Sequence, residues 1–333
     1  MVIGITGANG HVGVNLCKKL VSAGHEVRAF VHEHDQALRD IPVKIYRGDL
    51  LSTDSLKDFC TGTEILFHLA AKISISGDPD KSVFELNARG TRNIVETARM
   101  TGIKRMIHFS SIHAFQQLPH HIVLDEKRSL VGKEAFAYDC SKAEGERIVL
   151  SAAADGFDAV VLSPTAIIGP MDPEPGLMGK AFLQIYHQKV PALVPGGYDM
   201  VDVRDIVDAS VTAMEKAVKG EKYLLSGKWH SIREISVLIE EFTGVKTVKT
   251  EMPFWVARAG LPFITLYSKL LKSQPLYTGE SLTIIDHAHR NISNDKARKE
   301  LFFRPRDIRE SIRDVMEWFK NNKFLERNER APL

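Results

Sequence analysis

The sequence predicts an α/β protein built on a doubly wound parallel sheet (a Rossmann arrangement), with a smaller, mostly helical C-terminal lobe. Three observations support this prediction. A glycine-containing turn near the N-terminus joins an apolar run to a helical segment, and short apolar runs then alternate with segments of helical spacing. This alternation stops at a region rich in proline and glycine. Runs that are apolar at nearly every position are typical of strands buried on both faces, as in a parallel sheet.

The first turn, residues 6–13, has the composition of a nucleotide-binding loop. It lies between the apolar run 2–5 and a helical segment at 14–21, so backbone N–H groups and the positive end of a helix dipole converge there, which suits a pyrophosphate. We expect Gly7 to permit the tight turn, Gly10 to let the phosphates approach, and Gly13 to bring the helix against the sheet. The spacing of these glycines differs from the Gly-x-Gly-x-x-Gly pattern. The other residues of this loop assigned to the site are Asn9, His11 and Val12.

Further elements follow in βαβ order as far as residue 163. We expect strands over residues 25–31, 43–46, 64–70, 105–110 and 159–163, and helices over 53–60, 80–101 and 136–153. Between about 164 and 200, six prolines and five glycines interrupt the alternation, so we expect the chain to leave the sheet there. A helix over 205–218, with Asp205 as its N-cap, and a strand over 223–226 then return the chain to the first domain.

This order predicts two domains. The nucleotide-binding domain would comprise residues 1–165 and about 201–226, and the substrate lobe about 166–200 and 227–333. The lobe is expected to be mostly helical because helical patterns occupy 232–242, 254–271 and 308–319. Charged residues and a proline interrupt its apolar segment 253–271, which falls short of the roughly 20 apolar residues of a membrane span. We interpret that segment as a wall of the substrate pocket.

Composition narrows the function. The chain has 44 Lys and Arg against 42 Asp and Glu, a formal net charge of +2, and so offers no broad attraction for nucleic acid or an anionic membrane. We expect a small-molecule substrate. The three cysteines lie far apart, which favours a reducing compartment, and Met1 runs directly into the first strand with no room for a signal peptide, so we expect a cytoplasmic protein. His120 and His121 have no neighbouring ligands, so no metal site is predicted.

A second informative stretch is Tyr138-Asp139-Cys140-Ser141-Lys142. Tyr138 and Lys142 are four positions apart in a helical segment and therefore share one face. A cation held close to a phenol favours the phenolate, so we expect Lys142 to lower the pKa of Tyr138 and make it a usable acid or base. Ser111 follows the strand at 105–110, at the sheet edge where open α/β proteins bind ligands, and its hydroxyl could polarise a substrate carbonyl.

With the glycine loop, a serine at a strand end and Tyr-x-x-x-Lys in this order, the chain resembles the extended short-chain dehydrogenase/reductase family, also described as the NAD-dependent epimerase/dehydratase family. Within it the chain looks most like the branch related to dihydroflavonol reductases. The matching motifs outside the catalytic residues are Gly24 to Ala29, Gly48-Asp49-Leu50, His68 to Ala71, Asn87 with Gly90-Thr91, Pro164-Thr165 with Gly169-Pro170, and Val201 to Asp205.

The resemblance implies a role for each matching residue. Ser111, Tyr138 and Lys142 would form the catalytic triad, with Ser111 preferred over Ser110, and Asn87 would support Lys142 through water. Asp49 would meet the adenine amino group. The implied cofactor contacts outside the glycine loop are His32, Asp49, Leu50, Leu69, Ala70, Ala71, Lys72, Tyr138, Lys142, Pro164 and Thr165.

The end of the second expected strand departs from the pattern of NAD-preferring members. Val31 stands where they carry an acid, and His32 stands where dihydroflavonol reductases carry Arg. With His34 and Arg28 nearby, this composition suits the 2′-phosphate of NADP, whereas Glu33 opposes it. We expect NADP as the cofactor, with NAD as the alternative.

A second departure concerns the activity. Ile112 and His113 follow Ser111 where sugar dehydratases place an Asp-Glu pair, which argues against a dehydratase. We therefore expect an NADP-dependent carbonyl reductase or alcohol dehydrogenase acting on a small organic substrate held between the two domains. A sugar or nucleotide-sugar epimerase using the same residues, and a non-catalytic nucleotide-sensing regulator, are the alternatives. A homodimer is left open.

Overall fold

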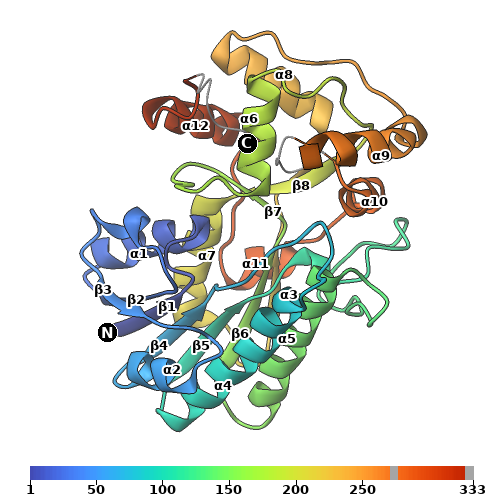
Figure 1. Cartoon of the computed structure of the whole chain (residues 1–333). Coiled ribbons are helices and arrows are strands. Elements are labelled where there is room, and N and C mark those ends of the chain that lie inside the picture. The colour runs from blue at the N-terminus through green and yellow to red at the C-terminus, as the bar shows by residue number, and fades with distance from the viewer. Residues whose placement is uncertain (271–276, 327–333) are drawn as a thin grey trace.

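The computed structural model describes residues 1–270 and 277–326 and confirms the predicted doubly wound fold (Figure 1). Seven parallel strands form one sheet in the spatial order β3-β2-β1-β4-β5-β6-β9. These strands are β1 (Val2–Thr6), β2 (Glu26–Val31), β3 (Lys44–Arg47), β4 (Ile65–His68), β5 (Arg105–Phe109), β6 (Ala159–Pro164) and β9 (Lys222–Leu225). Each lies within about two residues of its expected position, because a strand buried on both faces has an apolar run that the sequence displays directly.

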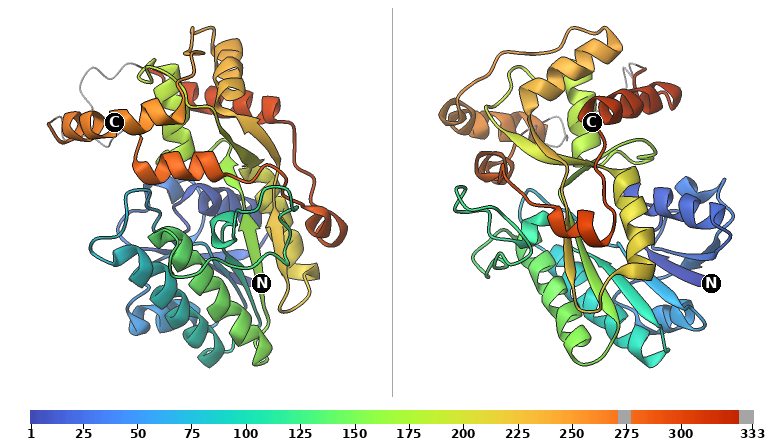
Figure 2. Two further views of the ribbon diagram at one scale, coloured as in Figure 1. Left: turned by 90° about the vertical axis from the view of Figure 1, so that its right-hand side faces the viewer. Right: turned by 180° about the vertical axis from the view of Figure 1, so that it is seen from behind.

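Helices cover both faces of this sheet (Figure 2). One face carries α1 (His11–Ser22) and α7 (Val203–Lys216), and the other carries α2 (Thr53–Cys60), α4 (Gly90–Met100) and α5 (Ala137–Ala154). Side chains alternate between the two faces along each strand, so that β4 sends Phe67 to the α1 side and Leu66 to the α4 side. The sheet therefore separates two apolar cores, which leaves its carboxyl edge as the open place for a ligand.

The remaining elements build a lobe above that edge (Figure 1). A second sheet has the order β10-β8-β7, with β8 antiparallel to β10 and parallel to β7. Its strands are β7 (Ala166–Ile168), β8 (Gly197–Asp202) and β10 (Lys228–Ser231). The helices of the lobe are α6 (Leu177–Tyr186), α8 (Ile232–Thr243), α9 (Phe254–Leu270), α10 (Gly279–His287) and α12 (Ile308–Asn321). The short helix α11 (Asp295–Glu300) packs instead beside β9.

The apolar segment expected at 253–271 forms α9 as far as Leu270, and the side chains from residue 263 onward lie outside those described. In the described part of the chain, none of the helices has both the length and the apolar character that crossing a membrane requires.

Helix α7 begins two residues earlier than expected, and its N-cap is Asp202. The Asp202 carboxylate accepts a hydrogen bond from the backbone N–H of Arg204 (2.8 Å). The prediction that Asp205 caps this helix was wrong. Asp205 lies within the first turn, where it accepts a hydrogen bond from the backbone N–H of Arg306 (2.8 Å). Both acids have a side chain suited to a cap, so the sequence alone does not distinguish them.

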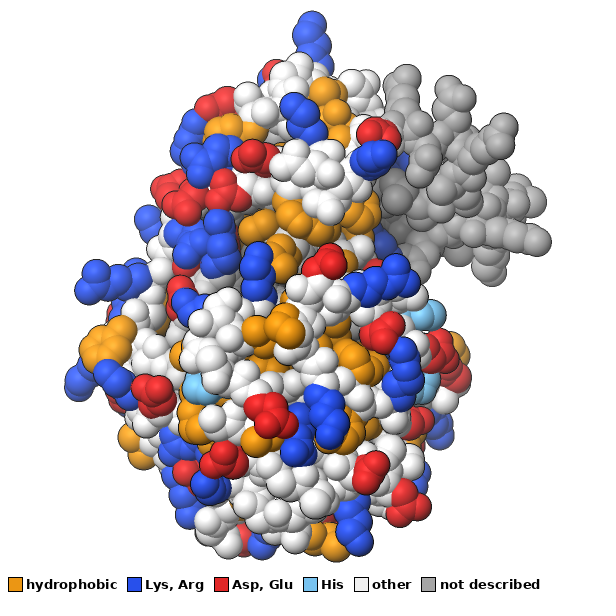
Figure 3. Space-filling view, turned by 90° about the vertical axis from the view of Figure 1, so that its left-hand side faces the viewer, with side chains coloured by type: hydrophobic (Ala, Val, Ile, Leu, Met, Phe, Trp, Pro, Cys, Tyr) orange, Lys and Arg blue, Asp and Glu red, His pale blue; other side chains and the backbone are white. Residues whose placement is uncertain are grey.

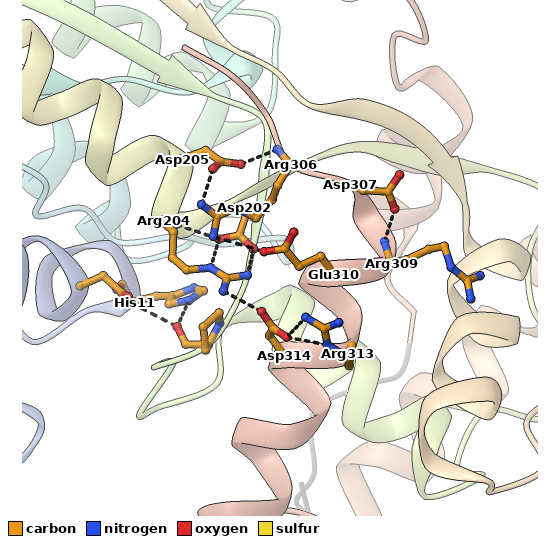
Figure 4. A network of polar contacts seen from close by, with 12 residues as sticks. His11, Asp202, Arg204, Asp205, Arg306, Asp307, Arg309, Glu310, Arg313 and Asp314 are labelled. Carbon is orange, nitrogen blue, oxygen red and sulfur yellow. Dashed lines mark hydrogen bonds and ion pairs between the residues drawn. The ribbon is translucent and has the colours of Figure 1, made fainter. Parts of the chain in front are cut away.

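Ion pairs around this cap join the two domains (Figure 4). Arg204 lies 2.8 Å from Asp202 and 2.7 Å from Asp314 of α12, while Arg306 lies 2.9 Å from Asp205. The Asp202 side chain is completely buried. Burial opposes its ionisation, but hydrogen bonds from Arg204 outweigh this effect and hold the pKa of Asp202 below its usual value. The lobe helix α12 is thus attached to the start of α7.

Replacing Arg204 by Met should destabilise the protein, because the buried Asp202 would keep only the longer contact with Arg306 (3.8 Å), while the apolar stem is kept. We expect the free energy of unfolding to fall by about 2 kcal/mol. This loss is smaller than the loss expected on breaking a fully buried ion pair, because Arg204 is partly exposed. Urea unfolding at neutral pH measures this loss. The matched control is Arg309→Met, whose pair with Glu241 is exposed on both sides and should matter little. Equal effects of the two substitutions would contradict the assignment.

Candidate active site

One cavity of about 510 Å³ runs from the carboxyl edge of the large sheet into the lobe. The glycine loop lines one end through Gly7, Gly10 and Gly13. Ser111, Tyr138 and Lys142 line the same cavity, although they come from the β5 loop and from α5. The structure therefore places the predicted nucleotide loop and the predicted catalytic residues around one space.

The glycine loop has two positions that exclude a side chain and one that admits it. Gly7 has a left-handed backbone (φ 70°), and a Cβ there would lie 2.7 Å from the backbone nitrogen of Ala70. A Cβ at Gly13 would lie 2.2 Å from the carbonyl oxygen of Gly7. At Gly10, by contrast, φ is −79° and the nearest atom to a Cβ would be 3.4 Å away. The open space beside Gly10 and the lack of a side-chain cap on α1 suit a bound pyrophosphate.

The other predicted cofactor residues lie in several different settings. Lys72 is exposed in the loop after β4 and donates from Nζ to the Ser82 hydroxyl (2.5 Å). His11, Val12, Leu69, Ala71, Pro164 and Thr165 line the cavity. Asn9 is half-buried in the loop, and the backbone N–H of Ala70 donates to the Thr6 hydroxyl (3.3 Å). Asp49 accepts a hydrogen bond from the backbone N–H of Leu51 (2.8 Å), and the Leu50 side chain is buried in the core beside α4. His32 is exposed just after β2.

Lys142 is a buried ammonium group. Its Nζ donates to the carbonyl oxygen of Phe109 at 2.5 Å, and its residue is only 5% exposed. Burial lowers the pKa of Lys142 to about 8, although the nearby Glu146 carboxylate opposes this shift. A cation at this depth lies where it can act on a ligand in the cavity with little screening by water.

The pKa of Tyr138 is shifted in the direction opposite to the one expected. Burial raises it to about 12, hydrogen bonding with Ser111 opposes this effect, and the charge of Asp139 adds to it. The expectation that Lys142 lowers the pKa of Tyr138 was therefore wrong for this arrangement. The loss of water around the phenol is the largest cause of the shift, and the Lys142 ammonium, which donates to the Phe109 carbonyl, does not offset it.

The two neighbouring serines have different partners. Ser110 Oγ donates to the fully buried carboxylate of Glu146 (2.7 Å). Ser111 Oγ accepts a hydrogen bond from the backbone N–H of His113 (3.2 Å) and is hydrogen-bonded to Tyr138 in the cavity. This difference favours Ser111 as the hydroxyl that faces a substrate.

Asn87 lies in a π-helical turn (Glu85–Arg89) that follows the short helix α3 (Ser82–Phe84). Its amide accepts from the backbone N–H of Lys72 (2.8 Å) and donates to the carbonyl of Lys72 and the hydroxyl of Ser141 (both 2.9 Å). Asn87 therefore ties the loop after β4 to helix α5, one residue before Lys142.

The sequence did not reveal the contact between His113 and Asp139. His113 Nδ1 lies 3.4 Å from Asp139 Oδ1, and the His113 ring packs edge-on against Tyr138. Burial lowers the pKa of His113 to about 4, whereas burial and the charge of Glu280 raise the pKa of Asp139 to about 7. The position of Asp139 directly after Tyr138 was the available signal.

The cationic neighbourhood expected at the end of β2 is also different. Arg28 donates to the carbonyl oxygen of Thr61 (2.6 Å), three residues before the end of the strand, and so takes no part in it. Arg47 replaces it. Arg47 pairs in register with Val31, and its guanidinium donates to the carbonyl of Glu33 (3.0 Å) and to Asp35 (2.5 Å).

Comparison with known proteins shows the family and the fold of this chain. The family model described as "NAD dependent epimerase/dehydratase family" matches residues 3–226. "Sterol demethylase protein B" of Methylococcus capsulatus is 32% identical over 96% of this chain and 99% of its own. "Putative dihydroflavonol 4-reductase" of Synechocystis is 30% identical over 96% of this chain and 95% of its own. UDP-glucose 4-epimerase of Thermotoga maritima superposes with a TM-score of 0.80, covering 97% of this chain and all of that one; at 18% identity this likeness shows the fold alone.

Gly10→Val should abolish nucleotide binding without unfolding the protein, because the side chain enters the open space where a pyrophosphate would lie. Calorimetric titration with NADPH and circular dichroism measure the two properties. Gly13→Val is the matched control, since its Cβ would overlap the Gly7 carbonyl and should unfold the domain. A folded Gly10→Val protein with unchanged affinity for NADPH would contradict the assignment of this loop to the pyrophosphate.

Proposed function

We propose, from the premise that this chain belongs to the NAD-dependent epimerase/dehydratase family, that it is an NADP-dependent carbonyl reductase or alcohol dehydrogenase. It is an NAD(P)-binding enzyme of the short-chain dehydrogenase/reductase type. The observation that carries the proposal is the meeting of a protonated phenol, Tyr138, with Ser111 and the buried ammonium of Lys142 in the cavity that also contains the glycine loop. The relative named as a dihydroflavonol reductase supports the same chemistry.

The cavity residues divide into those that hold the cofactor and those that act on the substrate. The glycine loop and the N-terminus of α1 would hold the pyrophosphate, while Leu69, Ala71 and Pro164 would border the rest of the nucleotide. When bound, the nicotinamide supplies or accepts the hydride. We assign residues 1–165 and about 201–226 to the cofactor domain, with α11 packed against it, and 166–200 and the rest of the chain from 227 to the substrate lobe.

The protonation states favour the reductive direction. With a pKa near 12, Tyr138 carries its proton at neutral pH and can give it to the oxygen of a substrate carbonyl. Ser111 would donate a hydrogen bond to the same oxygen as negative charge develops there. Lys142 lines the same cavity and would place its charge beside the cofactor. Above about pH 8 Lys142 loses that charge.

Tyr138→Phe keeps the ring and removes the proton donor. We expect NADPH to bind nearly as well as to the unaltered enzyme, while turnover falls by roughly 10²–10⁴-fold, the contribution typical of a general acid. Absorbance of NADPH during reduction of a panel of aldehydes and ketones measures turnover, and calorimetry measures binding. A reductase consumes one NADPH per product. If the protein instead interconverts sugar isomers without net loss of NADPH absorbance, it is an epimerase and the proposal fails.

We further propose that NADP is preferred over NAD. Val31 supplies no carboxylate for the ribose hydroxyl, and the imidazoles of His32 and His34 are exposed beside it. Arg47 adds a guanidinium at the same sheet edge. Glu33 opposes the preference because its carboxylate lies 3.7 Å from each imidazole.

Arg47→Ala should weaken NADPH binding by roughly tenfold or more, as expected for the loss of one charge-assisted hydrogen bond, and leave NADH binding unchanged. Glu33→Gln should strengthen NADPH binding. Arg28→Ala is the control on the neighbouring strand β2 and should alter neither affinity, because Arg28 donates to the carbonyl oxygen of Thr61. Fluorescence titrations with the two nucleotides measure these values. Tighter binding of NADH to the unaltered protein would assign Glu33 to the ribose and reject the preference.

A further inference from the structure

We propose that the substrate is an uncharged, mainly apolar carbonyl compound, whose body lies in an apolar chamber between α6, β8 and α10. This inference rests on the proposed reductase function and names the substrate class of the same site. The apolar chamber is the part of the cavity beyond Tyr138 that is lined by Phe182, Ile185, Val190, Leu193, Met200 and Ile235.

The chamber is built from the apolar core of the lobe. All six of its residues belong to the cluster that packs the second sheet against α6 and α8. Ile284 and Ile285 of α10 close it from another side. On the face drawn in Figure 3, hydrophobic side chains gather midway along the molecule, at the level where the lobe meets the large sheet. A ligand body placed here exchanges water for aliphatic side chains, which is favourable only for apolar surface.

The two buried charged groups of the cavity, Lys142 and Asp172, are not among the residues that define this chamber and already have partners. Lys142 donates to Phe109, while Asp172 accepts from the backbone of Gly176 (3.0 Å) and faces His11. Among the described residues that line the cavity, the other lysine is Lys180, which is exposed on α6, and arginine is absent. A diphosphate entering the chamber would lose its water without gaining cations, which is strongly unfavourable. The lining therefore selects against nucleotide sugars.

Two tyrosines give the chamber a limited polar capacity. Tyr198 of β8 and Tyr277, just before α10, both line it. Burial is the main cause that raises the pKa of each phenol, to about 12 for Tyr277, so both hydroxyls remain protonated donors. They can satisfy one neutral oxygen on a substrate that is otherwise apolar.

A neighbouring cavity of about 330 Å³ extends the available space. It shares His113, Thr165, Ala166, Tyr198 and Ile284 with the first cavity and continues beneath α10. Its presence allows a body that is longer or broader than a short aliphatic chain.

The test compares the apolar body of the substrate with its charge. With NADPH, kcat/KM for methyl ketones should rise about two- to fourfold for each added methylene from 2-butanone to 2-decanone, as expected for burial of one methylene. Ile284→Glu should lower kcat/KM for 2-decanone at least tenfold while NADPH affinity stays within twofold. Val237→Glu is the matched control, since Val237 is an exposed apolar residue of α8 outside the cavity. A flat series, or equal effects of the two substitutions, would overturn the proposal.

A binding measurement separates this inference from the reductase function. Calorimetry on the NADPH-loaded Tyr138→Phe protein should detect 2-decanone and no UDP-glucose. If the enzyme reduces none of the ketones but this pattern of binding holds, the reductase proposal fails and the assignment of the chamber stands. If UDP-glucose binds more tightly than 2-decanone, the chamber assignment is rejected whatever the turnover.

Discussion

The buried ammonium of Lys142 is the constraint on which the site depends. A charge removed from water is stable only where dipoles and opposite charges surround it. Here the Phe109 carbonyl lies 2.5 Å away, and Glu146, one turn along α5, is buried on the same side. Glu146 needs partners in turn, which are Ser110 Oγ at 2.7 Å and Lys222 Nζ at 3.4 Å. Lys142 thus connects α5 to β5, and Glu146 connects α5 to β9 and gives Ser110 its partner.

The charge of Lys142 also affects two histidines that lie below it. His68 and His108 stack below the site, and for both of them burial and then the charge of Lys142 lower the pKa. His68 remains neutral because burial lowers its pKa to about 3, and Thr6 and Thr91 hydrogen-bond its two ring nitrogens at 2.7 and 3.0 Å. This neutral layer therefore adds no second positive charge beside Lys142.

The sequence predicted the elements of the large sheet well because each strand there is buried on both faces. It missed α6 and the second sheet. Helix α6 follows several prolines and contains Gly179. A Cβ at this position would lie 2.8 Å from the Asp172 carboxylate, so the packing requires glycine. Glycine is unfavourable inside a helix, and the sequence therefore did not indicate one here. Strand β7 has three residues, too few to show a period. The candidate catalytic residues could be chosen from their spacing in the sequence. The direction of the pKa shift of Tyr138 could not be predicted in this way, because it depends on burial, which only the fold determines.

Two buried carboxylates on β8 show how the lobe is held in place over the catalytic edge. Asp199 and Asp202 are three residues apart on one strand and so point to opposite faces. Asp199 accepts from Thr165 Oγ1 (2.7 Å) and the backbone N–H of Gly227 (2.8 Å), and burial raises its pKa to about 6 because these neutral donors compensate it only in part. Asp202 has Arg204, and its pKa is lowered. The first carboxylate fixes the segment that leaves β6 beside the cavity, and the second fixes α12 to α7. Both attachments are made by β8, whose Tyr198 and Met200 line the cavity, so this strand holds the lobe side of the cavity over the catalytic edge.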